Sequence, residues 1–315
     1  MKRLPILTLC LLLAAPAALA QVPEERAEAF IETADLDRST TDFAAQLRQM
    51  VMMQSAQFPA PAGELFTERL GAGLEDEAIR QRLRDYVTEH AHADSLEAAL
   101  AWSEQPIIAS GLAQIREAST DPRAEVPIQM YAQTGQLGRH TVTPEREELA
   151  REYMRNTGAD QAATEMMMEL MVESSRFNAM LLDTEMPQED VLRAQVRQQF
   201  GDQMTAPMRA MVLYATREVD TDQFAEFVEM SDTDAARYYN RLATDGMTDA
   251  VVGGMMDGAQ QFLRELEALD AAGELDLDAW RQSTLEQMQQ QMPQAPAGEG
   301  EDAAAPAPDN AEYDH

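Results

Sequence analysis

Cysteine and lysine are nearly absent from this chain of 315 residues. It has one of each, Cys10 and Lys2, and both lie within the first 20 residues. That segment begins with positive charge, continues as a mostly apolar run and closes on a small-x-small site at Ala20, a pattern typical of a signal peptide. We therefore predict a signal peptide over residues 1–20 and a periplasmic or secreted protein that starts at Gln21. Without cysteine, the mature chain has no disulfide, thiolate nucleophile or thiolate metal ligand.

Long apolar runs are also missing. The apolar part of the leader is shorter than the ~20 residues that a membrane-spanning helix needs, and no later segment is both long and uncharged. Lipid attachment at Cys10 is not expected, because Leu9 precedes it where a lipoprotein signal carries a small residue. We expect no membrane insertion after cleavage of the signal peptide.

Positive charge is scarce throughout. The chain has 24 Lys and Arg against 56 Asp and Glu, and the mature part keeps 22 Arg for a formal charge of −34. Phosphate attraction supplies most of the affinity of nucleic-acid and anionic-lipid binding, so this charge excludes both classes of partner. The preference for Arg over Lys fits either an exported protein adapted to salt or a GC-rich coding bias.

Aromatic residues make up only 6% of the chain, and Gly and Pro number 15 each, which argues against a sandwich or barrel. Apolar residues instead recur every three or four positions, as in Ile79, Leu83 and Val87. We predict an all-α fold. Thr143 is expected to cap a helix that starts at Pro144, and Ser39 with Asp42 has the spacing of a capping box.

The two halves of the chain share a pattern. The segment Tyr86-Val87-Thr88 leads to Ser103, and Tyr214-Ala215-Thr216 leads to Ser231 at the same spacing. Tandem duplication explains this match, although two unrelated amphipathic helix patterns would also give it. We predict the following segments: a signal peptide (1–20), helical repeat 1 (23–118), a linker (119–143), helical repeat 2 (144–262), C-terminal helices that brace the bundle (263–292) and a disordered acidic Pro/Ala tail (293–315).

Small residues form a stripe late in the second half. The stripe consists of Gly246, Ala250, Gly253 and Gly254, with Gly258, on a predicted helix. Glycine lowers helix propensity unless another backbone approaches closely, so this stripe predicts tight packing between two helices.

Residues 214–242 carry an apolar-aromatic helix, a serine step at Ser231 and a helix with Arg237-Tyr238-Tyr239. This region resembles domain-of-unknown-function family 2059, a group of exported bacterial helical proteins, and residues 86–115 resemble a second, degenerate copy. Asp-Thr-Asp follows Ser231 where that family has Pro-x-Gly. The resemblance implies an all-helical periplasmic protein. It assigns no catalytic residue, because that family has no established activity.

Catalytic motifs are missing. The chain has no Gly-x-Ser-x-Gly, no His-Glu-x-x-His, no phosphate-binding glycine loop and no dinucleotide fingerprint. We therefore predict a non-enzymatic protein without a cofactor, with a cryptic hydrolase left open. His90 and His92 lie near Glu89 and Asp94, and His140 lies in the linker. A spacing of two places the first two rings on different helix faces, so surface histidines are expected and not a metal site.

Methionine is abundant, with 21 residues, 20 of them in the mature part. Thioethers bind copper(I), but these methionines share helix faces with aliphatic residues, which favours adaptable apolar packing. We predict an apolar groove for an unidentified polypeptide partner, in a chaperone or adaptor role, and keep a methionine-using periplasmic copper(I) carrier as the alternative. The expected groove residues are Met166, Met167, Leu170, Met171, Phe177 and Met208.

Overall fold

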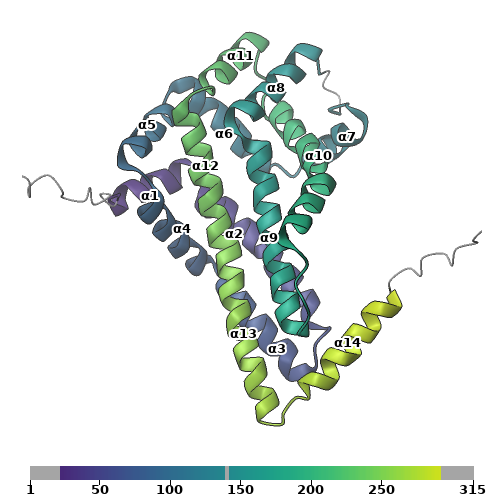
Figure 1. Ribbon diagram of the computed structural model, residues 1–315. Helices are drawn as coiled ribbons and strands as arrows, with labels where there is room; N and C mark the ends of the chain where they lie inside the picture. Colours follow the sequence, from purple (N-terminus) through teal and green to yellow (C-terminus); the bar gives the residue numbers. More distant parts are fainter. Residues whose placement is uncertain (1–21, 139–141, 292–315) are drawn as a thin grey trace, which may run out of the picture. The chain divides into compact units, whose positions relative to one another are not determined.

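The computed structural model describes residues 22–138 and 142–291. The predicted all-α fold is confirmed: these residues form fourteen α-helices and one π-helical turn, η1, and no β-strand (Figure 1). The predicted signal peptide and acidic tail lie outside the described residues, as does His140. The first seven helices are α1 (Glu24–Thr33), α2 (Leu36–Ser55), α3 (Ala60–Gly73), α4 (Asp76–His90), α5 (Ala93–Ser103), α6 (Pro106–Thr120) and α7 (Glu125–Thr134). The others are α8 (Pro144–Thr157), α9 (Ala159–Leu182), α10 (Glu189–Ala215), α11 (Thr221–Met230), α12 (Asp234–Thr248), η1 (Asp249–Gly253), α13 (Gly254–Ala271) and α14 (Leu277–Gln291).

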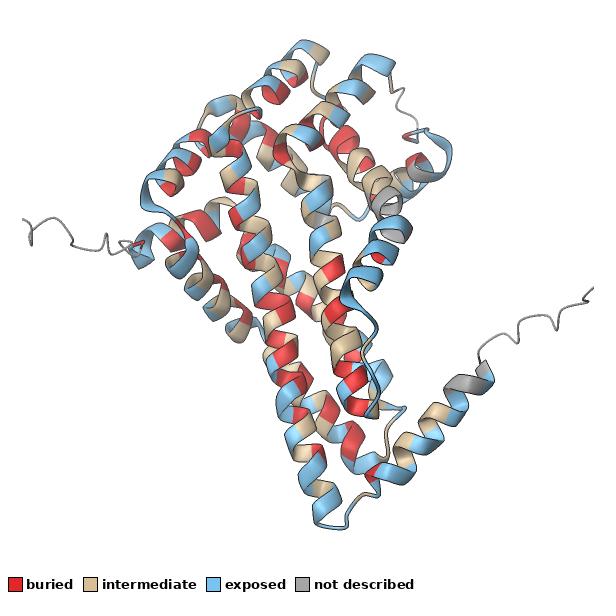
Figure 2. Cartoon of the chain, viewed as in Figure 1, coloured by how far each residue is buried: buried red, intermediate tan, exposed pale blue. Residues whose placement is uncertain are grey.

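The chain divides into two compact units after residue 275. Helices α1 to α13 belong to the first unit, and α14 belongs to the second. Within the first unit, buried residues follow one side of most helices and exposed residues the other (Figure 2). On α4, for example, Ile79, Leu83 and Val87 are all fully buried, as their spacing predicts.

The structure confirms one predicted helix start and corrects another. Thr143 Oγ1 accepts a hydrogen bond from the backbone N–H of Arg146 at 3.3 Å, and Pro144 is the first helical residue. Ser39 lies inside α2, and its hydroxyl donates to the carbonyl of Asp35. Thr233 caps α12, and Ser231 lies just before it at the end of α11. The hydroxyl of Ser39 and that of Ser231 each donate a hydrogen bond to the backbone carbonyl four residues earlier. Serine near a helix end often makes this bond in place of a capping bond.

The segment 119–143, predicted as a linker, contains a helix. Helix α7 packs against α10, with Pro127 in its first turn and Gly135 ending it at φ +72°. Proline is tolerated in a first helical turn, and glycine readily takes the left-handed conformation that closes a helix. Pro127 and Gly135, residue types that also favour loops, therefore mark the two ends of a short helix.

The predicted boundary at residues 262 and 263 falls inside a helix. Helix α12, η1 and α13 follow one another without a loop, so that Figure 1 shows one continuous helical rod from Asp234 to Ala271. The predicted segment of C-terminal helices, 263–292, is therefore divided between the two units. Helix α13 continues the rod in the first unit, and α14 belongs to the second unit.

The predicted tight packing at the small-residue stripe is confirmed. A Cβ atom added to Gly254 on α13 would lie 2.2 Å from the carbonyl oxygen of Gly73 on α3, and one on Gly258 would lie 2.3 Å from that of Arg69. No real side chain fits at such distances. Glycine at these positions lets the backbones of α3 and α13 approach each other directly.

Helices from the two halves of the first unit pack against each other. Helix α12 of the second half packs against α4 and α5 of the first, and α6 of the first half packs against α10 and α11 of the second. The indole N–H of Trp102 donates to the carbonyl of Met230 at 2.9 Å across this contact. The predicted duplication stays a prediction.

Candidate functional site

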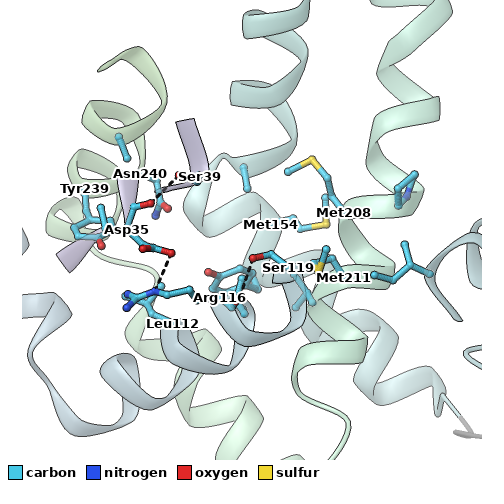
Figure 3. A pocket seen from close by; sticks show the side chains of 18 residues that line it. Asp35, Ser39, Leu112, Arg116, Ser119, Met154, Met208, Met211, Tyr239 and Asn240 are labelled. Atoms are coloured by element: carbon cyan, nitrogen blue, oxygen red, sulfur yellow. Dashed lines mark hydrogen bonds and ion pairs between the residues drawn. The ribbon is translucent and has the colours of Figure 1, made fainter. Parts of the chain in front are cut away.

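A cavity of about 480 Å³ lies where the two halves of the first unit meet. Its wall comes from the turn between α1 and α2 and from helices α2, α6, α7, α8, α9, α10 and α12 (Figure 3). The lining residues are Ala34, Asp35, Ser39, Leu112, Ile115, Arg116, Ser119, Ile128, Tyr153, Met154, Ala159, Pro207, Met208, Met211, Val212, Tyr239, Asn240 and Ala243. Its volume lies within the range of about 300–1,000 Å³ that is usual for small-molecule sites.

One end of the cavity is apolar and rich in methionine. Figure 3 shows Met154, Met208 and Met211 gathered there. Met154 is buried, and the other two are half-buried. Pro207 also lines the wall from inside α10, where a proline removes one backbone hydrogen bond and bends a helix. Flexible thioethers on such a wall adapt to apolar ligands of different shape.

The opposite end is polar. Asp35 sits in the short turn between α1 and α2 with a left-handed backbone, φ 53°. Its carboxylate accepts from Arg38 Nε at 3.0 Å and lies 3.7 Å from Arg116 Nε, the ion pair drawn in Figure 3. Arg116 Nη2 also donates to the carbonyl of Thr33 at 2.9 Å. Arg116 therefore ties α6 to the turn that presents Asp35.

Two buried tyrosines complete the lining. Tyr239 on α12 packs its ring edge-on against Phe30 at 5.2 Å, and Tyr153 on α8 stacks on Phe227 at 5.0 Å. Tyr153 and Tyr239 are only 6% and 4% exposed, and neither hydroxyl makes a hydrogen bond to another described residue. Neither hydroxyl is one of the fully enclosed side-chain atoms without a partner, so each keeps accessible surface at which water or a ligand can bind.

The pKa of each tyrosine reflects its position. Burial raises the pKa of Tyr153 and of Tyr239 well above the ordinary value, because the phenolate would lose its hydration. For Tyr239, the positive charge of Arg116 opposes this rise, while Tyr153 and Asp35 add to it. The groups that influence the Tyr239 hydroxyl are therefore its neighbours around the cavity. Both hydroxyls stay protonated at neutral pH and serve as hydrogen-bond donors.

The residues predicted for a polypeptide groove are divided among three places. Met208 lines the cavity. Met166, Met167, Leu170 and Met171 are half-buried on α9 and are not among the lining residues. Phe177 is buried in a separate aromatic cluster, where its ring lies 6.2 Å from those of Phe66 and Phe262.

The predicted surface histidines lie away from the cavity. His90 ends α4, where its ring stacks on Tyr86 at 4.3 Å, and His92 donates its backbone N–H to the hydroxyl of Tyr238. Both histidines are exposed. Across residues 22–138 and 142–291, no group of three or more His, Cys, Asp or Glu side chains is arranged to hold a metal ion.

Sequence reasoning missed the polar end of the cavity. Tyr239 was noted only as part of an Arg-Tyr-Tyr segment, and Asp35, Arg116 and Asn240 gave no signal. These residues come from three distant parts of the chain and have no local spacing in common. A basic residue among the apolar residues of α6 was the one available sign, because Arg116 follows Leu112 and Ile115 on the same stretch.

Within the described part of the chain, no helix combines the length and the apolar character that a bilayer span needs. No family model, curated protein or solved structure matches this chain. The resemblance to domain-of-unknown-function family 2059 therefore stays a prediction. What can be inferred about function comes from the geometry of the cavity.

Proposed function

We propose that this protein is an exported, non-enzymatic binding protein that holds an apolar small molecule in the cavity between its two halves. The observation that carries the proposal is the cavity itself, which combines a small-molecule volume with an apolar, adaptable end built from Met154, Met208 and Met211. Of the predicted groove residues, only Met208 lines it. A small molecule therefore replaces a polypeptide as the favoured ligand.

A fluorescence titration with N-phenylnaphthylamine, an uncharged apolar dye, tests this proposal. We expect saturable binding of one dye per mature protein. Ala243 lines the cavity from α12, so Ala243→Phe fills part of the space and should abolish the binding. Ala98 is exposed on α5, and Ala98→Phe is the matched control that should bind normally. Equal binding by the two variants would place the dye elsewhere and contradict the proposal.

A copper(I) carrier is the second candidate, because three thioethers line one end of the same cavity. Soft sulfur ligands select copper(I), provided that their sulfur atoms converge on one point. The test is a copper(I) titration of the Met208→Leu, Met211→Leu double variant, which keeps the apolar volume and removes two sulfurs. The exposed residues Met52 and Met53 give the matched control double variant. Copper binding lost only in the cavity variant would favour this candidate.

A further inference from the structure

The ligand's polar group can be assigned from the residues at the polar end. We propose, on the basis of the function proposed above, that the cavity selects an apolar molecule with one uncharged hydrogen-bonding head, such as a hydroxyl, and that Tyr153 and Tyr239 bind this head. Such a ligand places its chain against the methionines and its head at the end of the cavity where Tyr239 lies (Figure 3), with Tyr153 as the second tyrosine of the lining.

The tyrosines supply the hydrogen bonds. Both tyrosines are buried residues that line the cavity, and their hydroxyls keep accessible surface and have no hydrogen bond to another described residue, so an apolar molecule in the cavity would leave them unsatisfied. A ligand hydroxyl accepts from one phenol and donates to another acceptor nearby. Asn240 is such an acceptor, because its amide nitrogen donates to the carbonyl of Ala236 at 2.9 Å and its oxygen stays available. A site built in this way rejects molecules that cannot make these bonds.

The charges at this end disfavour a charged head. Asp35 and Arg116 are the two charged side chains among the described lining residues, and they pair with each other. A carboxylate head would compete with Asp35 for Arg116, and an ammonium head would compete with Arg116 for Asp35. Either exchange replaces one ion pair of half-buried side chains, 39% and 25% exposed, by another and adds no pair, while the charged head still loses its own hydration in the cavity. An uncharged head leaves the Asp35–Arg116 pair intact.

Displacement of bound N-phenylnaphthylamine by decanol, decanoate and decylammonium tests the proposal, since the three probes share a chain and differ in the head. We expect decanol to bind at least about fivefold more tightly than either charged probe, the ratio that one net hydrogen bond gives. Tyr239→Phe should weaken decanol about fivefold relative to the dye, because only decanol has a hydroxyl that uses the phenol. Its ring contacts with Phe30 and Trp102 do not need the hydroxyl, and circular dichroism checks that the variant folds.

Asp35→Asn provides the reciprocal variant. Asparagine tolerates the left-handed backbone at this position, so the turn is kept while Arg116 loses its carboxylate partner. We expect decanoate to gain affinity in this variant and to match or exceed decanol. Equal affinities for the three probes in the wild type, or tightest binding of decanoate there, would overturn the assignment of the head while the proposed function stood. Failure of the dye itself to bind would overturn the proposed function.

Discussion

Asp35 is one of two residues other than glycine with a positive φ in the described part of the chain. Its left-handed backbone lets α1 end and α2 begin within two residues, and its carboxylate joins Arg38 and Arg116. Aspartate and asparagine take this conformation at lower cost than other residues with a Cβ atom, because their side chains hydrogen-bond locally. The turn and the ion pair at the cavity therefore depend on the same residue.

We predict that Asp35→Ala lowers the free energy of unfolding by about 1–2 kcal/mol, the usual cost of a left-handed alanine. Asp35→Gly should lose less, since glycine takes this backbone without strain. Urea unfolding of the two variants measures the difference. Greater stability of the alanine variant would show that the turn does not need a residue suited to positive φ.

Asp121 makes the stability of the fold depend on pH. Arg123 donates to its carboxylate from both Nε at 2.9 Å and the backbone N–H at 3.0 Å, and the hydroxyl of Tyr214 donates at 3.1 Å. These bonds, those from Arg123 first, lower the pKa of Asp121 to about 2. An unfolded aspartate has a pKa of about 3.9. The contribution is therefore complete above about pH 4 and is lost as the pH falls toward 2.

We predict that Asp121→Asn is less stable than the wild type at pH 6 and that this difference shrinks as the pH falls from about 4 to about 2. Urea unfolding at several pH values measures it. Asp94→Asn, at an exposed residue of α5, is the control for general effects of removing one carboxylate. A difference that stayed constant over this range would mean that Asp121 has the same pKa in both states.

Single residues of the cavity were only partly predictable. The methionines were recognised from their abundance, and Met208 does line the cavity. The residues at the polar end were not recognised from the sequence, because Asp35, Arg116 and Tyr239 come together only in the tertiary fold. Local spacing carries no information about such a meeting.

At the scale of elements, the contact between α3 and α13 depends on glycine. We predict that Gly254→Ala lowers the free energy of unfolding by about 1–3 kcal/mol, the usual cost of overpacking, because the new Cβ would lie 2.2 Å from the carbonyl oxygen of Gly73. Gly71 on α3 has nothing within 4 Å of an added Cβ. Gly71→Ala should therefore be neutral or stabilising, by up to about 1 kcal/mol.

Chemical unfolding of the two alanine variants gives the comparison directly. Equal effects at the two positions would contradict the close approach, since both substitutions change helix propensity in the same way. Hydrogen exchange of α3 and α13 in the Gly254→Ala variant should show faster opening of both helices, because they share the contact.

Helices were predictable where one face is apolar and the ends are marked. The fully buried residues of α4 follow a simple helical spacing, and Pro144 begins α8 as expected. Helix α7 was missed because Pro127 and Gly135 favour both a loop and a short helix with these residues at its ends. Only its packing against α10 decides between the two.

At the scale of the whole first unit, each half buries helices of the other half. Helices α6 and α12 pack against helices of the opposite half, and the indole of Trp102 bonds to Met230 across the contact. We predict that residues 22–138 and 142–275, produced separately, show little cooperative unfolding, and that mixing them restores the helical signal and a single transition. Circular dichroism during thermal unfolding measures both. Cooperative unfolding of either fragment alone would show that the halves fold independently.

The cavity lies at this contact, so binding and the joining of the halves should be coupled. Any molecule that binds only the folded form stabilises it by mass action, about 2.7 kcal/mol at one hundred times the Kd. A ligand in the cavity touches helices of both halves and should slow their separation. A ligand on a single helix would protect only that helix.

Hydrogen exchange of the mature chain, with and without saturating decanol, tests the ligand site most directly. We predict added protection in α6, in α12 and in the part of α10 that follows Pro207, together with the turn at Asp35, because these segments line the cavity. Helices α3 and α13 form their own contact away from the lining residues and should change little. Protection confined to α9 around Met166 to Met171, with none in α6 or α12, would contradict the cavity as the binding site.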